Sequence, residues 1–301
     1  MRCTHLVTLS LLATSALAAQ ESPFAFTGGS VKSAYIVYDL LSKGKPLPGA
    51  SWESGVTADR WIMRMKMPME VAGKKDTVRS WVVETRDSQY KYNSMGAQRG
   101  DADVSPTLRF HLAREYAALN PAAKARFKEN LKLGTSDNST ASSDMDMFIT
   151  LTGEKVGSET IAGVKCDVYK RQGRTACVVP GAPMVMLRWV DEKEGTVLEA
   201  KKVTLNGAVP TVASVLPKGV TWRKKPASDA DFILGVWSLK HPEKDPEQVP
   251  VASLAKFAVG YLASAGATAE LREMTAGTES GSSEDMGGDG SSEEEPDTSG
   301  S

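Results

Sequence analysis

Hydrophobic and polar residues alternate with a period of two along several segments of the chain. In the clearest segment, residues 60–69, one face carries Trp61, Met63, Met65, Met67 and Met69. The other face carries Arg60, Arg64 and Lys66, interrupted by Ile62 and Pro68. Successive side chains of a strand point to opposite faces, so the pattern predicts a strand with one apolar face in an antiparallel sheet. Pro68 indicates an edge or a strand end, because proline cannot donate to a ladder of hydrogen bonds.

Other segments rich in β-branched and aromatic residues predict further strands. We expect them at 33–40, 78–85, 148–152, 165–170, 175–179, 184–190, 197–205 and 211–216. Turns containing Gly, Asn or Pro separate many of these segments, for example Gln172-Gly173 and Asn206-Gly207.

Helical spacing occurs in two regions. Ser105-Pro106 is a typical N-cap and first-turn pair, and apolar residues then recur every three or four positions as far as Gly134. This predicts two short helices, or one kinked helix, near 105–134. A last helix is expected from Pro250 to about Met274, as a cover for the sheet rather than a mobile lid.

Many strands, few helices and no regular strand–helix alternation argue against a parallel α/β fold. The sequence predicts an α+β protein in which a curled antiparallel sheet is covered by helices. The concave face of such a sheet is apolar, so either helices cover it or a ligand fills it.

The two ends of the chain differ from its body. Arg2, the apolar run 6–12 and Ala16-Leu17-Ala18 predict a secretory signal peptide over 1–18, with a mature chain from about Ala19. No cysteine follows the cleavage site, so we expect an exported protein, periplasmic or secreted, without a lipid anchor. Residues 275–301 carry eight acidic and no basic residues, which predicts a disordered, solubilising tail. The body is then 19–225, followed by a linker and helix over 226–274.

Cys166 and Cys177 are the two cysteines that follow the leader, and an oxidising compartment favours a disulfide between them. They flank a hairpin with Gln172-Gly173 at its tip. A two-residue turn would place Cys177 opposite residue 168, so that the sulfurs lie diagonally and further apart than usual. A bulge or a longer loop would bring them opposite each other.

The sequence of 301 residues contains no recognised catalytic motif: G-x-S-x-G, H-E-x-x-H, the Walker A motif and a dinucleotide fingerprint are all missing. Three histidines are too few for a multi-histidine metal site, and nothing indicates a cofactor. The basic clusters are short and lack stacking aromatics, which argues against nucleic-acid binding. No apolar run after the leader is long enough for a transmembrane helix.

The Trp/Met face of 61–69 is the most informative feature. Methionine is flexible and polarizable, so such a face could line a pocket for acyl chains or lipid-modified peptides. An ordinary sheet core would give the same pattern.

The region 154–222 carries a recognisable order of motifs. Residues 157–169 read G-x-E-x-I-A-G-x-K-x-x-x-Y from Gly157 to Tyr169, and Leu187–Asp191 and Leu216-Pro217-Lys218-Gly219 follow. This resembles uncharacterised periplasmic proteins related to the LolA/LolB-like lipoprotein-carrier superfamily, loosely over 30–225. The resemblance implies an unclosed antiparallel β-barrel whose apolar concavity is covered by helices and, in the carriers, holds acyl chains. No site residue is carried over from that family, and 226–301 falls outside its pattern.

We therefore expect an exported, non-enzymatic binding protein that holds a lipid or other apolar group on Trp61, Met63, Met65, Met67 and Met69. One alternative is a structural or interaction protein of the cell envelope with a solid core and a protein partner. Another is a secreted hydrolase with an unrecognised site beside His111 or His241.

Overall fold

The fold is seen in a computed structural model of the chain. It describes residues 22–71, 74–94, 101–134, 149–171, 173–225, 237, 240–245, 248–267 and 269–270. The predicted leader and the acidic tail lie outside these residues. The described helices are α2 (Arg109–Ala117), α3 (Pro121–Gly134), α4 (Ile149–Thr152), α5 (Val212–Val215) and α7 (Val251–Ala263).

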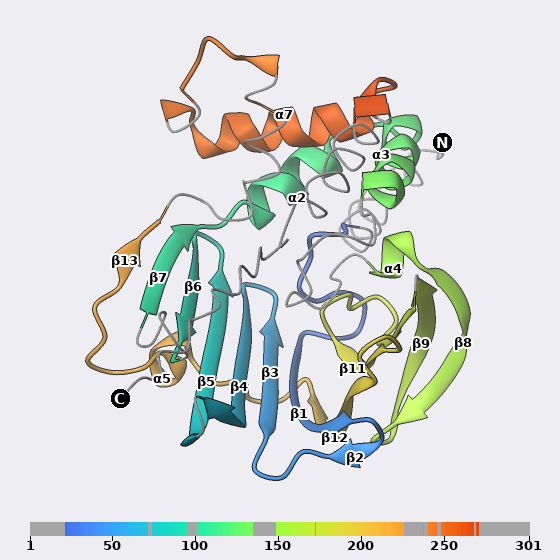
Figure 1. The fold of residues 1–301 in the computed structure, drawn as a ribbon. Coiled ribbons are helices and arrows are strands. Elements are labelled where there is room, and N and C mark those ends of the chain that lie inside the picture. The colour runs from blue at the N-terminus through green and yellow to red at the C-terminus, as the bar shows by residue number, and fades with distance from the viewer. Residues whose placement is uncertain are drawn as a thin grey trace, which may run out of the picture.

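One curled sheet of 13 strands dominates the described residues (Figure 1). One half consists of β3 (Ser51–Thr57), β4 (Arg60–Val71), β5 (Lys74–Thr85), β6 (Ser88–Asn93), β7 (Asp101–Pro106) and β13 (Arg223–Lys224). The other half consists of β1 (Ser33–Ser42), β2 (Lys45–Pro46), β8 (Glu154–Ile161), β9 (Val164–Arg171), β10 (Arg174–Val178), β11 (Met186–Asp191) and β12 (Thr196–Leu205).

The strand order is β13-β7-β6-β5-β4-β3-β1-β12-β11-β10-β9-β8, with β2 added beside β1. Every pair is antiparallel except β13 with β7. Within the described residues the two ends of this order, β13 and β8, are not paired with each other, so the sheet is open. The predicted α+β class and the curled, unclosed antiparallel sheet are confirmed.

Three helices, α2, α3 and α7, gather at one end of the strands, at the top of Figure 1. There α2 and α3 pack against α7 around Phe24, Tyr116, Phe127 and Val259, which form a core distinct from that of the sheet. Phe110 of α2 packs against the core of the sheet, edge-on to Phe26 with ring centroids 5.6 Å apart. The helices therefore cover one end of the trough rather than its whole length.

The far side of the sheet has a smaller apolar cluster. Ile62 and Val83 meet there, and α5 covers them through Val215. The segment just before α5, which contains Val209, crosses β3 closely. A Cβ added at Gly55 would lie 2.8 Å from Val209 Cγ1. This contact explains the glycine in the middle of a strand.

Most predicted strands are confirmed, but two predicted strands are single helical turns. The segment 211–216 forms α5, with Thr211 as N-cap accepting from the Ser214 N–H at 3.3 Å. The segment 148–152 contains α4, whose Ile149 packs against Ala176 and Val178. In both cases packing against the sheet outweighs the β preference of Val, Ile and Thr, and in α5 the Thr211 cap adds to it.

The helix boundaries also differ from the prediction. Ser105 and Pro106 end β7, where Ser105 pairs with Gln89 of β6, and α2 begins only at Arg109. The last helix, α7, ends at Ala263 instead of about Met274, with Ser264 in an extended conformation. Pro68 lies where β4 runs beyond β3 and has β5 as its neighbour, which agrees with its predicted position at an edge.

Cys166 and Cys177 form the predicted disulfide and join β9 to β10, both fully buried. Arg174 pairs with Arg171 and Cys177 with Val168, which is the register of the two-residue turn. The expectation that this diagonal would be too long is wrong, because the Cα atoms are 5.4 Å apart. The twist of the sheet shortens one diagonal, so no bulge between these two strands is needed.

Candidate functional site

A groove of about 890 Å³ opens on the concave side of the sheet, at the end away from the helices. Apolar and aromatic lining residues come from both halves of the sheet: Leu40, Trp52, Met63, Met65, Met67, Trp81, Val82, Tyr92, Trp189 and Leu198. Leu47 beside β2 and Thr196 at the start of β12 place it near the lower end of Figure 1.

Strand register explains which side chains share the concave face, since directly paired residues point to the same side. Three rows cross β3 to β7. The row nearest the helices is Val56, Trp61, Glu84, Gln89 and Ser105. The next is Ser54, Met63, Val82, Lys91 and Asp103, and the last begins with Trp52, Met65, Ser80 and Asn93.

The row nearest the helices is filled by protein. Arg109 at the start of α2 reaches down to Glu84, with Nε 3.0 Å from Oε1, and both side chains are at most 5% exposed. Thr107 Oγ1 donates to the same carboxylate at 2.7 Å, and the guanidinium lies over the Phe26 ring at 4.7 Å. This buried network closes the upper part of the trough.

The predicted Trp/Met face therefore divides into a packed part and a lined groove. Trp61 belongs to the core, is 5% exposed and donates its indole N–H to Ser54 Oγ at 3.1 Å. Met63, Met65 and Met67 line the groove, and Met63 is also part of the core. Met69 is half-buried further along β4 and is not part of the groove lining. All five residues share one face, as predicted.

Trp52 on β3 and Trp189 on β11 also line the groove, together with the methionines of β4. The sequence analysis did not identify either of them as a site residue. The segment 51–57 was not identified as a strand, although Trp52, Ser54 and Val56 alternate there. The indole nitrogens of Trp52 and Trp189 are shielded from solvent and have no hydrogen-bond partner within the described part of the chain. Buried donors without an acceptor are rare in proteins, and a ligand is one thing that satisfies them.

The groove becomes polar toward the β7 and β13 edge. In the strand register, Lys91 of β6 lies opposite Asp103 of β7, and Asp103 lies opposite Arg223 of β13. Arg223 also forms an ion pair with Asp103, with Nε 2.9 Å from Oδ1. Lys225 and Asn93 complete this side of the lining. A carboxylate on the opposite wall, Glu194, belongs to the turn before β12.

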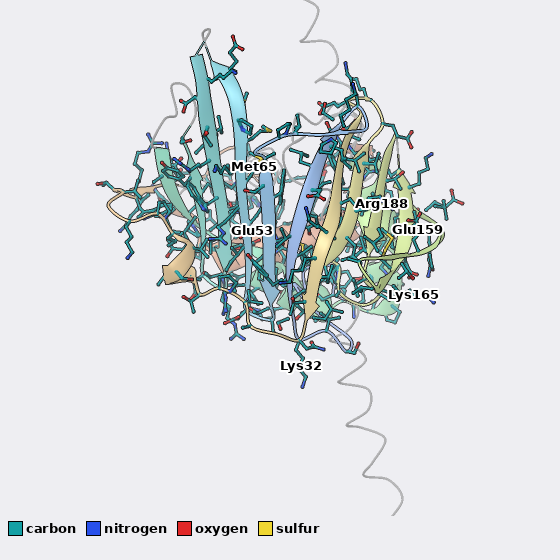
Figure 2. The ribbon with its side chains drawn as sticks, turned by 90° about the horizontal axis from the view of Figure 1, so that it is seen from below. Lys32, Glu53, Met65, Glu159, Lys165 and Arg188 are labelled. Atoms are coloured by element: carbon teal, nitrogen blue, oxygen red, sulfur yellow. A yellow bond between two sulfur atoms is a disulfide. The ribbon has the colours of Figure 1, made fainter. Side chains whose placement is uncertain are left out.

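A second charged cluster lies on the other half of the sheet. Arg188 on β11 contacts Glu199 on β12 at 2.6 Å and also Glu159 on β8. Figure 2 shows Arg188, Glu159 and Lys165 together there, apart from Met65 and Glu53 on β4 and β3. The arginine is matched by two carboxylates, so this cluster is a surface ion-pair network and not a candidate site.

The histidines lie away from the groove. His111 is in α2. His241 lies in the helical part, where its ring is tilted against Trp237 and edge-on to Phe257, and its Nδ1 is 3.9 Å from Glu243 Oε1. Neither lines the groove. Among the described residues no group of three or more His, Cys, Asp or Glu side chains could hold a metal ion. Across the same residues, every helix is too short or too polar to cross a membrane.

No family model and no curated protein matches the sequence. Solved structures match weakly. PNGF-II has 12% identity and a TM-score of 0.36, over 67% of this chain and 32% of that chain. An uncharacterised conserved protein from Thermus thermophilus has 11% identity and a TM-score of 0.31, over 71% of this chain and 99% of that chain. MucB has 12% identity and a TM-score of 0.29, over 70% of this chain and 65% of that chain. The chain thus spans about a third of PNGF-II, and at these TM-scores the matches say nothing about function.

Proposed function

We propose that the protein is an extracytoplasmic, non-enzymatic binding protein that holds the apolar chain of a lipid-like ligand in the groove. The observation that carries the proposal is the groove itself, about 890 Å³ in volume and lined by methionine, tryptophan and leucine side chains. Ligand sites in proteins are typically apolar concavities of roughly 300 to 1,000 Å³ with a few polar groups.

The chemistry of the lining suits an alkyl chain. Methionine side chains adapt to partners of varied shape, and Met63, Met65 and Met67 lie on consecutive inward positions of β4. Trp52 and Trp189 add broad apolar surfaces from β3 and β11. Each methylene group moved from water into such surroundings contributes up to about 0.8 kcal/mol before ordering costs.

Two other features fit this proposal. The disulfide is typical of proteins in oxidising compartments, which agrees with the expected export. The groove also favours a binding protein over an envelope interaction protein with a solid core, because Arg109 and Glu84 fill only the upper part of the concave face.

The test is displacement of the fluorescent apolar probe N-phenyl-1-naphthylamine by dodecyl compounds below their micellar concentrations. Met65→Glu places a charge on the groove face and should weaken probe binding at least tenfold, because an ionised carboxylate resists burial. Lys66→Gln is the matched control, since it changes the charge by the same amount at the next residue of β4, on the opposite face. Unfolding curves of both variants establish that they are folded.

The proposal fails if the wild-type protein binds neither probe nor alkyl chain. It fails equally if folded Met65→Glu binds the probe as tightly as Lys66→Gln does.

A further inference from the structure

We infer that the ligand carries an uncharged carbonyl oxygen, as an ester or an amide does, which accepts a hydrogen bond from the indole N–H of Trp52 or Trp189. The inference rests on the proposed function and adds the group that the protein recognises on an otherwise apolar ligand. It follows from two buried donors without a partner and from their position in the groove.

The first observation concerns the hydrogen bonding of these indoles. The Nε1 atoms of Trp52 and Trp189 are shielded from solvent, and neither has a hydrogen-bond partner among the residues that the structure describes. Trp61 in the same sheet differs, because its indole N–H donates to Ser54 Oγ at 3.1 Å. A buried donor without an acceptor destabilises a protein, so each one calls for an explanation such as an acceptor from outside the chain.

The second observation concerns where the two indoles lie. Both line the groove, Trp52 from β3 and Trp189 from β11. In the strand register, Trp189 lies opposite Leu198 of β12, which lies opposite Leu40 of β1. Trp52 lies opposite Tyr38, two residues before Leu40 on β1. The two donors therefore flank the same part of the groove, with leucine side chains between them.

An acceptor reaches these nitrogens only where the surrounding side chains shift, because both atoms are already shielded. The neighbours allow such a shift. Met65 is the register partner of Trp52 on β4, and Trp189 packs against the cluster that contains Met186. Methionine has three rotatable bonds and repacks readily around a new group.

The surroundings also favour an uncharged acceptor. The register partners of Trp189 are Leu198 and Ala176, and Trp52 lies beside Met65. An ionised carboxylate would lose its hydration there without gaining a cation, whereas a carbonyl oxygen needs only one donor. Esters and amides of long-chain acids combine such an oxygen with the apolar chain that the groove suits.

The experiment compares three ligands with equal numbers of non-hydrogen atoms: methyl nonanoate, N-methylnonanamide and 1-chloroundecane, which is a very poor acceptor. Each displaces N-phenyl-1-naphthylamine from the wild type, Trp52→Phe and Trp189→Phe. Phenylalanine keeps an aromatic ring and removes the donor. The measured quantity is the affinity of each carbonyl ligand relative to the chloride, because the cost of removing a ligand from water is the same for every variant.

We expect this ratio to fall at least threefold in one or both variants, which is the loss of one hydrogen bond. The carbonyl ligand with the larger fall distinguishes an ester-linked from an amide-linked chain. Trp222→Phe is the matched control, since Trp222 packs edge-on to Tyr90 and does not line the groove. It should leave the ratio within twofold of the wild-type value.

A second readout needs no variant of the groove. In ¹H–¹⁵N NMR spectra of the wild type, methyl nonanoate should move the Nε1–H proton resonance of Trp52 or Trp189 further downfield than 1-chloroundecane does. A response at either tryptophan supports the inference and identifies the donor.

The inference is overturned if the indole resonances respond alike to the ester and the chloride, or if both variants keep the ratio within twofold. The proposed function stands in that case, because the chloride still binds. If none of the three ligands binds, both the inference and the proposed function are wrong.

Discussion

Arg109 is predicted to be the most sensitive charged residue of the fold. Its guanidinium lies 3.0 Å from Glu84 Oε1, with 5% and 2% of the two side chains exposed. It also donates to Phe24 O at 3.4 Å and lies over the Phe26 ring. The pair fastens the start of α2 to β5 at the point where the concave face changes from packed to open.

Arg109→Met removes the positive charge and leaves the Glu84 carboxylate buried with the Thr107 hydroxyl as its partner. Breaking a buried ion pair in this way costs about 3–5 kcal/mol of the free energy of unfolding, because an unpaired charge stays in a medium of low dielectric constant. The double variant Glu84→Leu/Arg109→Met removes both charges. It should be more stable than Arg109→Met alone, although Thr107 then loses its acceptor, at about 1–3 kcal/mol.

The assay is equilibrium unfolding in urea at pH 7, followed by tryptophan fluorescence, with midpoint and slope compared between variants. Arg114→Met is the control on the same helix. The Arg114 side chain is 63% exposed and pairs with its neighbour Glu115, so its loss should change stability by less than about 0.5 kcal/mol. The reasoning is refuted if Arg109→Met costs less than about 1 kcal/mol, or if the two single changes add within about 0.5 kcal/mol in the double variant.

Three further predictions concern the sheet. Replacing Cys166 and Cys177 by serine should lower the free energy of unfolding by about 3 kcal/mol, because the disulfide closes a loop with a sequence separation of 11. If the urea midpoint of the wild type does not change when a reductant is added, this prediction is wrong. Burial raises the pKa of Tyr38 well above 10.0, so its neutral form stabilises the fold below that pH and the contribution is lost as the pH rises. At pH 11 the wild type should therefore have lost about 1.4 kcal/mol more than Tyr38→Phe, and parallel pH profiles of urea midpoints would exclude the effect. Gly55→Val should cost about 1–3 kcal/mol by urea unfolding, because Val209 crosses β3 there, and an unchanged midpoint would show that the crossing segment yields freely.

Periodicity in the sequence was sufficient to identify most of the sheet. Segments with one apolar face, such as 60–69 and 197–205, were found because burial on one side imposes a period of two. The exposed strand β8 and the short strand β6 were not recognised from this pattern, since β8 is solvent-exposed along nearly all its length and β6 has only six residues. The turns α4 and α5 were predicted as strands because their residues favour strands and only contact with the sheet makes them helical.

The sequence by itself determined that Trp61 and the four methionines share a face, because side chains alternate along a strand. It also favoured a disulfide between Cys166 and Cys177, on the ground of an expected oxidising compartment, whereas the tertiary structure decided that the diagonal between them is short enough. Only the tertiary structure decided that Trp61 is packed while Met65 and Met67 line a groove. That difference depends on Arg109, which arrives from a helix far along the chain and fills one end of the trough. The polar edge, too, forms only when β13 pairs with β7, more than a hundred residues away in sequence.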